Sequence, residues 1–285
     1  MINYLILLFG VFVSSWSSIL IRWMGDVHPL IITFYRLFFS VLLLLPFWHL
    51  KRQPAKFTVS KNKFFLLGLA GFFLAMHFFS WIQSLQWTSV GNSIFLESTH
   101  PIFALILSYF FLKEKGSKLV ILGIILALTG IYLIVSGDVS KQHISTLGDL
   151  MAILSAFFLA AYLLIARFYR HEINLIPYLV QVYLAAAVVT FAFLLIFKLN
   201  FWQLTAKNWI LLLLLALGPN LIGHSLLNWA SRKMPVYLVN LAMQGEAVLA
   251  TLFAAWLLNE IPAASFYPGA LLILIAVSFI FWVRK

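Results

Sequence analysis

The sequence predicts an all-α integral membrane protein with ten transmembrane helices, arranged as a 5+5 inverted repeat with both termini in the cytoplasm. The first observation behind this prediction is composition: of 285 residues, 64% are hydrophobic and only 9% are charged. Soluble globular proteins are about half apolar and about a quarter charged. So few charged groups cannot cover a water-facing surface, and lipid is the solvent that suits this chain. The other two observations are a series of long apolar runs and an internal repeat.

Ten apolar runs follow one another along the chain, each close to the roughly 20 residues that a helix needs to cross a bilayer. They lie at about 4–23, 30–50, 64–84, 88–112, 118–137, 147–168, 174–197, 208–230, 236–258 and 266–283. Strands of a membrane barrel are about half as long and alternate in polarity, so helices are favoured. The first run has no basic leader and no clear cleavage site, so we expect a retained helix and not a signal peptide.

Several kinds of chemistry are excluded by what the sequence lacks. There is no cysteine, so disulfides, thiolate zinc sites and cysteine nucleophiles are excluded. The Gly-x-Ser-x-Gly, His-Glu-x-x-His and phosphate-binding-loop patterns are also missing. The histidines in the runs share no helix at ligand spacing, so no metal site is expected. We therefore expect neither an enzyme nor an ATP-driven pump, and no cofactor.

The basic residues predict the orientation of the helices. The net charge of +11 would suggest a nucleic-acid partner in a soluble protein. Here the lysines and arginines stand in short loops, so we interpret them as topology signals and expect no nucleic acid. With a cytoplasmic N-terminus, ten spans place most of them inside and leave only four outside the cytoplasm: Arg22, Lys141, Lys198 and Lys207. This bias favours cytoplasmic termini.

The chain repeats itself at an offset of 146 residues. Leu112 and Glu114 match Leu258 and Glu260, and Gly123 matches Gly269. The repeat predicts two units, 1–146 and 147–285, with five spans each. Because five is odd, the second unit must enter the membrane upside down. That plan is typical of secondary transporters with a site near the membrane midplane. A receptor, a lipid-handling protein or an embedded enzyme remains an alternative, although a receptor has no need of such two-sided symmetry.

Two segments at equivalent places in the repeat resemble a known family. The stretch 97–114 (ESTHPIFALILSYFFLKE) resembles the fourth-helix signature of EamA-type members of the drug/metabolite transporter superfamily, and 245–260 (GEAVLATLFAAWLLNE) resembles the ninth-helix signature. The links 84–90 and 230–236 and the Gly148-Asp149-Leu150 start of the second half are also similar. One difference is that His100-Pro101 stands where the family often has Glu-Pro, so its coupling residue cannot be transferred to this position.

The resemblance implies an exporter of small metabolites, such as an amino acid or a related polar or amphiphilic solute, that works by alternating access in the plasma (inner) membrane of a prokaryote. It also implies a cavity lined by the first, third, fourth, sixth, eighth and ninth helices, with the fifth and tenth peripheral. An importer or a facilitator on the same fold stays open. Neither the substrate nor the oligomeric state follows from the resemblance.

Ionisable side chains inside spans are costly in lipid and indicate function by default. Six such groups are candidates for substrate binding or coupling: Arg36, His77, Glu97, His100, His224 and Glu246. Glu97 and His100 share one helical face. Pro101 removes a backbone donor and predicts a break in that helix. Because His100 maps onto Glu246 in the repeat, we expect the two to approach each other. Glu97, His100 and Glu246 together motivate a proton-coupling hypothesis.

The remaining candidates carry two interpretations each. Arg36 either binds a substrate carboxylate or pairs with Glu97 or Glu246, and the pairing is slightly favoured. His77 and His224 lie in the third and eighth runs and act either as structural hydrogen-bonding groups or as pH switches. The same choice between site and core applies to the polar and aromatic residues on nearby faces: Trp16, Trp81, Tyr162, Asn228 and Gln244. Trp16 and Tyr162 are equivalent in the repeat, where core packing competes with an aromatic box for a cation.

Overall fold

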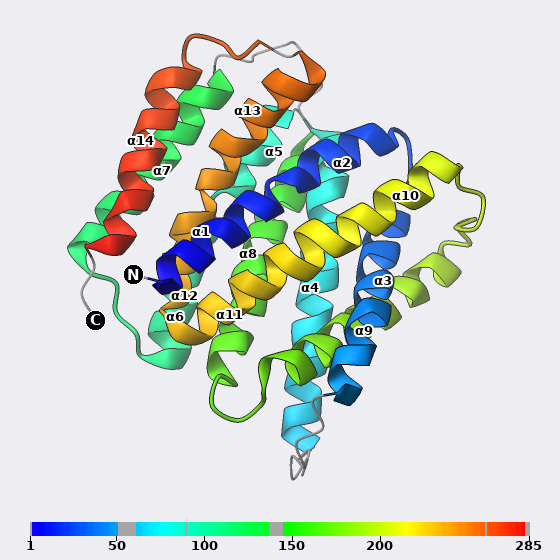
Figure 1. Cartoon of the computed structure of the whole chain (residues 1–285). Coiled ribbons are helices and arrows are strands. Elements are labelled where there is room, and N and C mark those ends of the chain that lie inside the picture. The colour runs from blue at the N-terminus through cyan, green and yellow to red at the C-terminus, as the bar shows by residue number, and fades with distance from the viewer. Residues whose placement is uncertain (1, 51–60, 89, 137–144, 260, 283–285) are drawn as a thin grey trace.

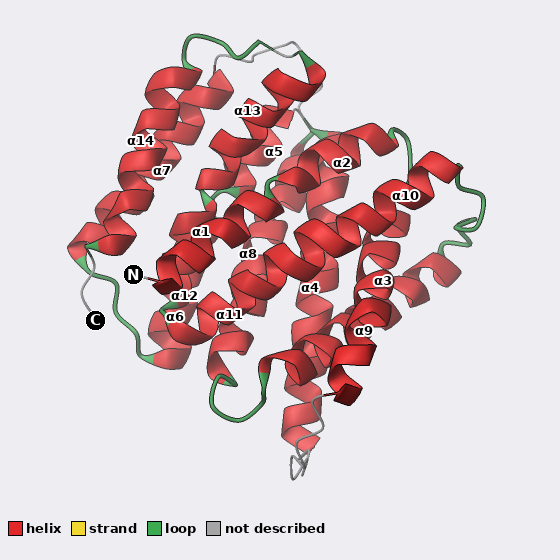
Figure 2. Cartoon of the chain, viewed as in Figure 1, coloured by secondary structure: helices red, strands yellow, loops and turns green. Residues whose placement is uncertain are grey.

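The structure is a computed structural model that describes residues 2–50, 61–88, 90–136, 145–259 and 261–282. Every regular element in these ranges is a helix (Figures 1 and 2). The helices of the first half are α1 (Ile2–Ser14), α2 (Trp16–Met24), α3 (Pro29–Leu50), α4 (Lys61–Trp87), α5 (Val90–Glu97), α6 (His100–Leu112) and α7 (Lys118–Ser136). Those of the second are α8 (Thr146–Phe168), α9 (Leu175–Ile196), α10 (Ala206–Leu215), π-helix η1 (Ala216–His224), α11 (Ser225–Lys233), α12 (Val236–Met243), α13 (Gly245–Leu258), α14 (Phe266–Ser278) and 3₁₀-helix η2 (Phe279–Phe281).

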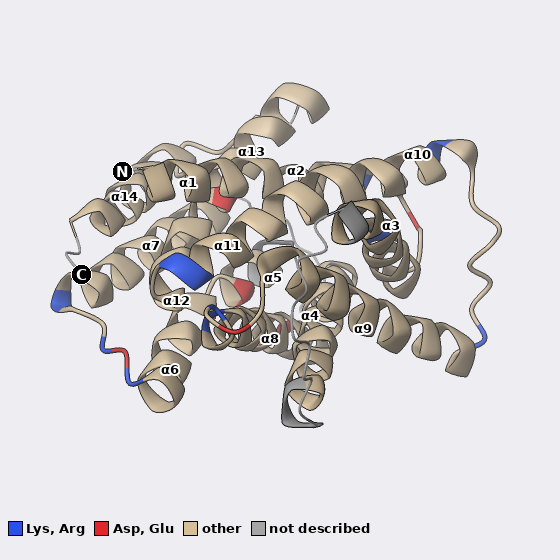
Figure 3. Ribbon diagram, turned by 60° about the horizontal axis from the view of Figure 1, so that its bottom comes forward, with Lys and Arg blue, Asp and Glu red and all other residues tan. Residues whose placement is uncertain are grey.

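These helices join into ten consecutive segments that coincide with the ten apolar runs. In the described part of the chain, nine segments are long and apolar enough to cross a membrane, and the tenth, Phe266–Phe281, is a shorter apolar helix. The expected all-helical membrane architecture is therefore confirmed. Figure 3 shows lysines and arginines mainly at helix ends and loops, with long uncharged stretches between them. Large apolar side chains such as Phe64, Leu195 and Trp256 are exposed, as a lipid-facing surface requires.

Four of the ten segments are interrupted. The first breaks at Ser15, the fourth at Ser98–Thr99, the ninth at Gln244, and the eighth passes through η1, which contains Pro219. The break in the fourth agrees with the prediction from Pro101, which has no N–H to continue the helical ladder. The fourth and ninth segments also end alike, since Lys113 and Asn259, 146 positions apart, both adopt left-handed backbone conformations.

The bundle packs around α4 and α8, which lie side by side at its centre, with α9 and α3 on one flank (Figure 1). α7 and α14 form a close pair on the other flank, because Gly130 and Gly269 each lie against the backbone carbonyl of the other. The first and last described helices, α1 and η2, meet at one end of the bundle: the rings of Tyr4 in α1 and Phe281 in η2 lie 5.1 Å apart.

Substitution of two glycines that lie one turn apart on α4 is expected to change the stability of the protein in opposite directions. A Cβ at Gly71 would lie 2.8 Å from the backbone nitrogen of Ala186 and the carbonyl oxygen of Val182 in α9, whereas a Cβ at Gly68 meets nothing within 4 Å. We expect Gly71→Ala to lower the free energy of unfolding by about 1–3 kcal/mol through overpacking. Gly68→Ala, the matched control, should be neutral or stabilise by up to about 1 kcal/mol. Tryptophan-fluorescence melting in detergent measures both, and equal melting temperatures would contradict the close α4–α9 contact.

Candidate functional site

A cavity of about 630 Å³ enters the bundle from the end that carries the α2–α3 and α13–α14 connections. Gly25 and Val27 on one connection and Ile261 on the other lie at its rim, so it opens among the loops. The neighbouring His28 accepts a hydrogen bond from the backbone N–H of Leu30 (3.2 Å) through Nδ1. Burial lowers the pKa of His28 below its ordinary value, so its imidazole is neutral at pH 7.

The interior of this cavity contains both acidic candidates. Glu97 ends α5 and Glu246 stands in the first turn of α13, so the two breaks place the carboxyl groups on the same cavity. The two side chains are close enough to interact electrostatically, and Glu246 Oε1 has no hydrogen-bond partner in the described protein. The N-terminus of a helix presents free N–H groups and favours negative charge, which suits Glu246.

The two broken segments are hydrogen-bonded to each other beside these carboxyl groups. Gln244 Nε2 donates to the carbonyl oxygen of Ser98 (2.6 Å), which lies at the break in the fourth segment. His100 Nδ1 lies 2.8 Å from Asn240 Oδ1, and Asn240 Nδ2 donates to the carbonyl oxygen of Val236. His100 and Glu246 both line the cavity, so they are brought together as neighbours, but the imidazole is bonded to Asn240. Sequence reasoning missed Asn240, although it precedes Gln244 by four residues and shares its helical face.

A second group of polar candidates lies deeper, in the centre of the bundle. Arg36, His77 and His224 are buried, with the rings of the two histidines 6.3 Å apart. Arg36 Cζ lies 3.5 Å from the centre of the Phe78 ring, a cation–π contact. His77 Nδ1 lies 2.9 Å from Ser155 Oγ in α8. The favoured pairing of Arg36 with Glu97 or Glu246 is absent: no guanidinium nitrogen bonds to a described residue, although Arg36 interacts electrostatically with Glu246.

The aromatic and amide candidates are divided between these regions and the core. Trp81 lines the cavity, together with Gln244. Trp16 packs against Phe253 of α13 with tilted rings whose centres lie 4.6 Å apart, and the fully buried Tyr162 accepts a hydrogen bond from Asn228 Nδ2. Neither Trp16 nor Tyr162 is among the described residues that line the cavity. They occupy separate packing sites, which favours the core interpretation of both rings over a shared aromatic box.

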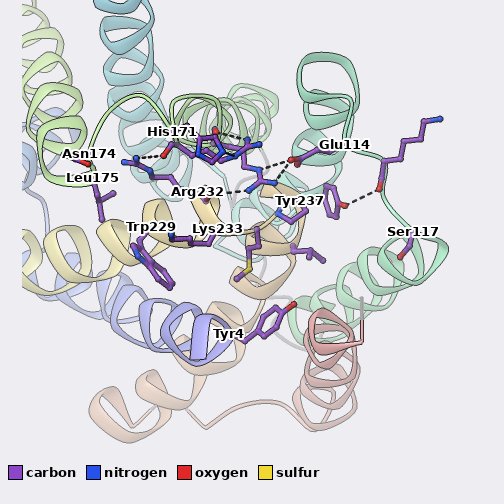
Figure 4. A pocket seen from close by; sticks show the side chains of 16 residues that line it. Tyr4, Glu114, Ser117, His171, Asn174, Leu175, Trp229, Arg232, Lys233 and Tyr237 are labelled. Atoms are coloured by element: carbon purple, nitrogen blue, oxygen red, sulfur yellow. Dashed lines mark hydrogen bonds and ion pairs between the residues drawn. The ribbon is translucent and has the colours of Figure 1, made fainter. Parts of the chain in front are cut away.

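The opposite end of the bundle carries a network of one ion pair and several hydrogen bonds that sequence reasoning missed (Figure 4). Glu114, just after α6, accepts hydrogen bonds from Arg167 Nε (2.9 Å) and Nη2 at the end of α8. Arg232 in α11 donates to the carbonyl oxygens of Arg170 and Ile173. This network, which we call the Glu114–Arg167 latch, ties the ends of α6, α8 and α11 together.

The latch borders a second cavity, of about 840 Å³, that lies at the end of the bundle where α1 begins. Tyr4 near the start of α1 lines it, whereas Arg22 near the end of α2 lines the cavity of the carboxyl groups. In the fourth segment, Glu97 lines the cavity of the carboxyl groups, and Glu114, just after that segment, lines the second cavity. About 25 Å of helix rise separates these two residues. The two cavities therefore enter from opposite ends of the bundle.

The lining of the first cavity differs from the expectation for helices five and ten. Ile134 and Val135 of α7 and Phe266 of α14 lie on it, so these two helices are not peripheral there. The sixth and eighth segments provide no described lining residue. Their candidates His224 and Asn228 belong to the buried polar region beneath.

Apolar helices that break around a cavity with two carboxyl groups define the class as a multi-pass membrane transporter. The chain belongs to the EamA-like transporter family, whose sequence profile matches residues 1–136 and again 146–282. It is 24% identical over 258 residues to an uncharacterized transporter of Archaeoglobus fulgidus, a match that covers 89% of this chain and 77% of the relative. The protein is therefore a transporter of the drug/metabolite type and not an enzyme, as its sequence predicted.

Two further comparisons are partial or concern the fold alone. The chain is 31% identical over 103 residues to an S-adenosylmethionine uptake transporter of Rickettsia bellii, which covers 36% of this chain and 34% of that protein. The matched stretch thus spans only about a third of either chain. A solved crystal structure of a protein with 16% sequence identity superposes with a TM-score of 0.83 over 98% of this chain and 96% of the other. That likeness supports the helical fold.

Proposed function

We propose that this protein is a secondary transporter that moves a small polar or amphiphilic metabolite, such as an amino acid or a relative of one, by alternating access. The observation that carries the proposal is a cavity that contains the carboxyl groups of Glu97 and Glu246 and enters the bundle from one end. At the opposite end, the Glu114–Arg167 ion pair joins the ends of α6 and α8 beside the second cavity. A volume of about 630 Å³ lies in the range of pockets that hold small metabolites.

The two halves, 1–146 and 147–285, form an inverted repeat in this proposal. Three observations support it besides the sequence matches. The family profile matches each half separately. The left-handed ends at Lys113 and Asn259 are 146 positions apart, and so are Ser98 and Gln244, which bond to each other. The helix contacts are also equivalent between the halves. The third segment (α4) packs on the sixth (α8), and their counterparts in the repeat, the eighth segment (η1 and α11) and the first (α1), pack on each other.

The orientation follows from the positive-inside rule. The latch end carries Lys113, Lys115, Arg167, Arg170, Arg232 and Lys233, so we assign it to the cytoplasm, together with both termini. The cavity of the carboxyl groups then faces the outside of a plasma membrane. This assignment makes the described conformation outward-facing.

Coupling to protons is a further part of the proposal. Carboxyl and histidine side chains inside spans are the usual proton carriers of pumps and transporters. Glu97, His100 and Glu246 meet that description at one cavity. The direction of transport is open between the export that the family resemblance suggested and the uptake named for the Rickettsia relative.

Counterflow in proteoliposomes tests the proposal. Purified protein is reconstituted with an unlabelled pool of L-amino acids and S-adenosylmethionine inside, and each labelled compound is offered outside at two pH values. We expect one class of solute to accumulate at least tenfold over protein-free liposomes, with a rate that changes when a pH gradient is imposed. Folded protein that accumulates no member of the pool would contradict the proposed substrate class.

A further inference from the structure

Arg36 is a buried cation whose hydrogen-bonding groups the protein leaves unused. Its side chain is 0% exposed, and Nε, Nη1 and Nη2 have no hydrogen-bond partner among the residues that the structure describes. The Phe78 ring covers one face of the guanidinium, with Cζ 3.5 Å from the ring centre, and a ring face accepts no full hydrogen bond from the N–H groups at the guanidinium edge. Burying a charge without paired hydrogen bonds is strongly unfavourable. A purely structural arginine is therefore poorly explained by this environment.

The surroundings of Arg36 suit an anion. His77 and His224 interact electrostatically with it, and Tyr183 of α9 lies close enough to do the same. His224 Nδ1 also has no hydrogen-bond partner in the described protein. Among the described residues, Glu246 is a carboxylate that acts on Arg36 electrostatically, and it lines the cavity without a hydrogen bond to the guanidinium. The buried cluster thus offers several N–H groups and no carboxylate of its own.

The cluster lies directly beneath the floor of the cavity. Ile32 of α3 and Trp81 of α4 line the cavity. Arg36 comes four residues after Ile32, and His77 comes four residues before Trp81. Each therefore lies on the same helical face as its lining residue, one turn or about 5.4 Å deeper in the bundle. Ser14, which also lines the cavity, packs against Gly223 beside His224. That part of the eighth segment is the π-helix η1, and π-helical turns are frequent at functional sites.

We infer that Arg36 is the anion subsite of the transported solute, reached from the cavity through the layer of Ile32 and Trp81. The planar guanidinium fork fits a carboxylate in a bidentate manner. Glu97 and Glu246, at the other side of that layer, fit a cationic group on the same molecule. The substrate class is therefore a small zwitterion in which several bonds separate the carboxylate from a cationic centre, such as the side-chain ammonium of a basic amino acid or the sulfonium of S-adenosylmethionine. This inference rests on the proposed transport function.

Paired ligands test the subsite. Melting of the purified protein is followed by tryptophan fluorescence with L-amino acids or S-adenosylmethionine, and with the methyl esters of the same amino acids. We expect the free acids to stabilise wild-type protein and the esters to bind at least tenfold more weakly. Arg36→Met should remove this difference, Arg36→Lys should retain part of it, and Lys207→Met, an exposed control, should leave it unchanged. Equal binding of acids and esters by the wild type would overturn the inference.

A second arm does not depend on finding the solute. Because Arg36→Met replaces an unsatisfied buried charge with an apolar chain, it should melt at or above the wild-type temperature when no solute is present. A melting temperature clearly below that of the wild type and of Lys207→Met would assign Arg36 a structural role and overturn the subsite. If no acid or ester stabilises the wild type, the proposed substrate class fails, whereas this arm still decides the role of Arg36.

Discussion

Glu246→Gln is expected to reduce the rate of solute counterflow at least 100-fold in proteoliposomes while leaving the helical content and the melting profile close to wild type. The amide has nearly the same shape as the carboxyl group, but it carries neither a charge nor a transferable proton. Glu246 Oε1 makes no hydrogen bond within the described protein, so little packing is lost. A group that binds the solute or the coupling proton should therefore show a large functional loss with a small structural one.

The control and the double variant make the prediction specific. Asp26→Asn removes a carboxylate from an exposed loop near the same end of the bundle and should transport at the wild-type rate. Because Glu97 and Glu246 interact, the Glu97→Gln Glu246→Gln double variant should be little slower than the slower single variant. Wild-type rates and wild-type pH dependence in both single variants would exclude proton coupling through these residues.

Much of the fold could be predicted because lipid imposes simple rules on a chain. A span needs about 20 apolar residues and no free backbone groups, so the ten runs and the break near Pro101 are visible as residue types and spacings. The same periodicity placed Glu97 and His100 on one face. These features depend on local sequence, and the structure has them where they were expected.

The partners of the buried groups could not be predicted in this way. Helical spacing says which residues share a face, but the rotation of each helix in the bundle decides what that face meets. His100 therefore bonds to Asn240 although its repeat-equivalent is Glu246, and Arg36 lies on Phe78 although two carboxylates were available. Arg167 was hidden for another reason: a basic residue at a helix end serves the topology of any membrane protein, so its pairing with Glu114 leaves no separate signal.

Breaking the Glu114–Arg167 latch is expected to open the bundle from the end that we assign to the cytoplasm. The pair is mostly buried, with side chains 11% and 18% exposed, so Arg167→Met leaves Glu114 without its ion-pair partner. The loss of one partner of such a pair costs on the order of 1–3 kcal/mol after allowance for partial exposure. Each 1.4 kcal/mol shifts a two-state population about tenfold. Arg167→Met should therefore raise the inward-facing population by roughly tenfold or more.

Cysteine accessibility measures this shift without background, because the chain contains no cysteine. Ala247→Cys places one thiol on the cavity beside Glu246, and a membrane-impermeant maleimide is applied to inside-out vesicles. Labelling should be slow in the wild-type background and roughly tenfold faster with Arg167→Met. Lys233→Met, an exposed charge at the same end, should have no effect. The exchanged pair Glu114→Arg Arg167→Glu should restore slow labelling, since the attraction between the two groups survives exchange. Fast labelling in the exchanged variant, or slow labelling in Arg167→Met, would show that the ion pair does not hold this end closed.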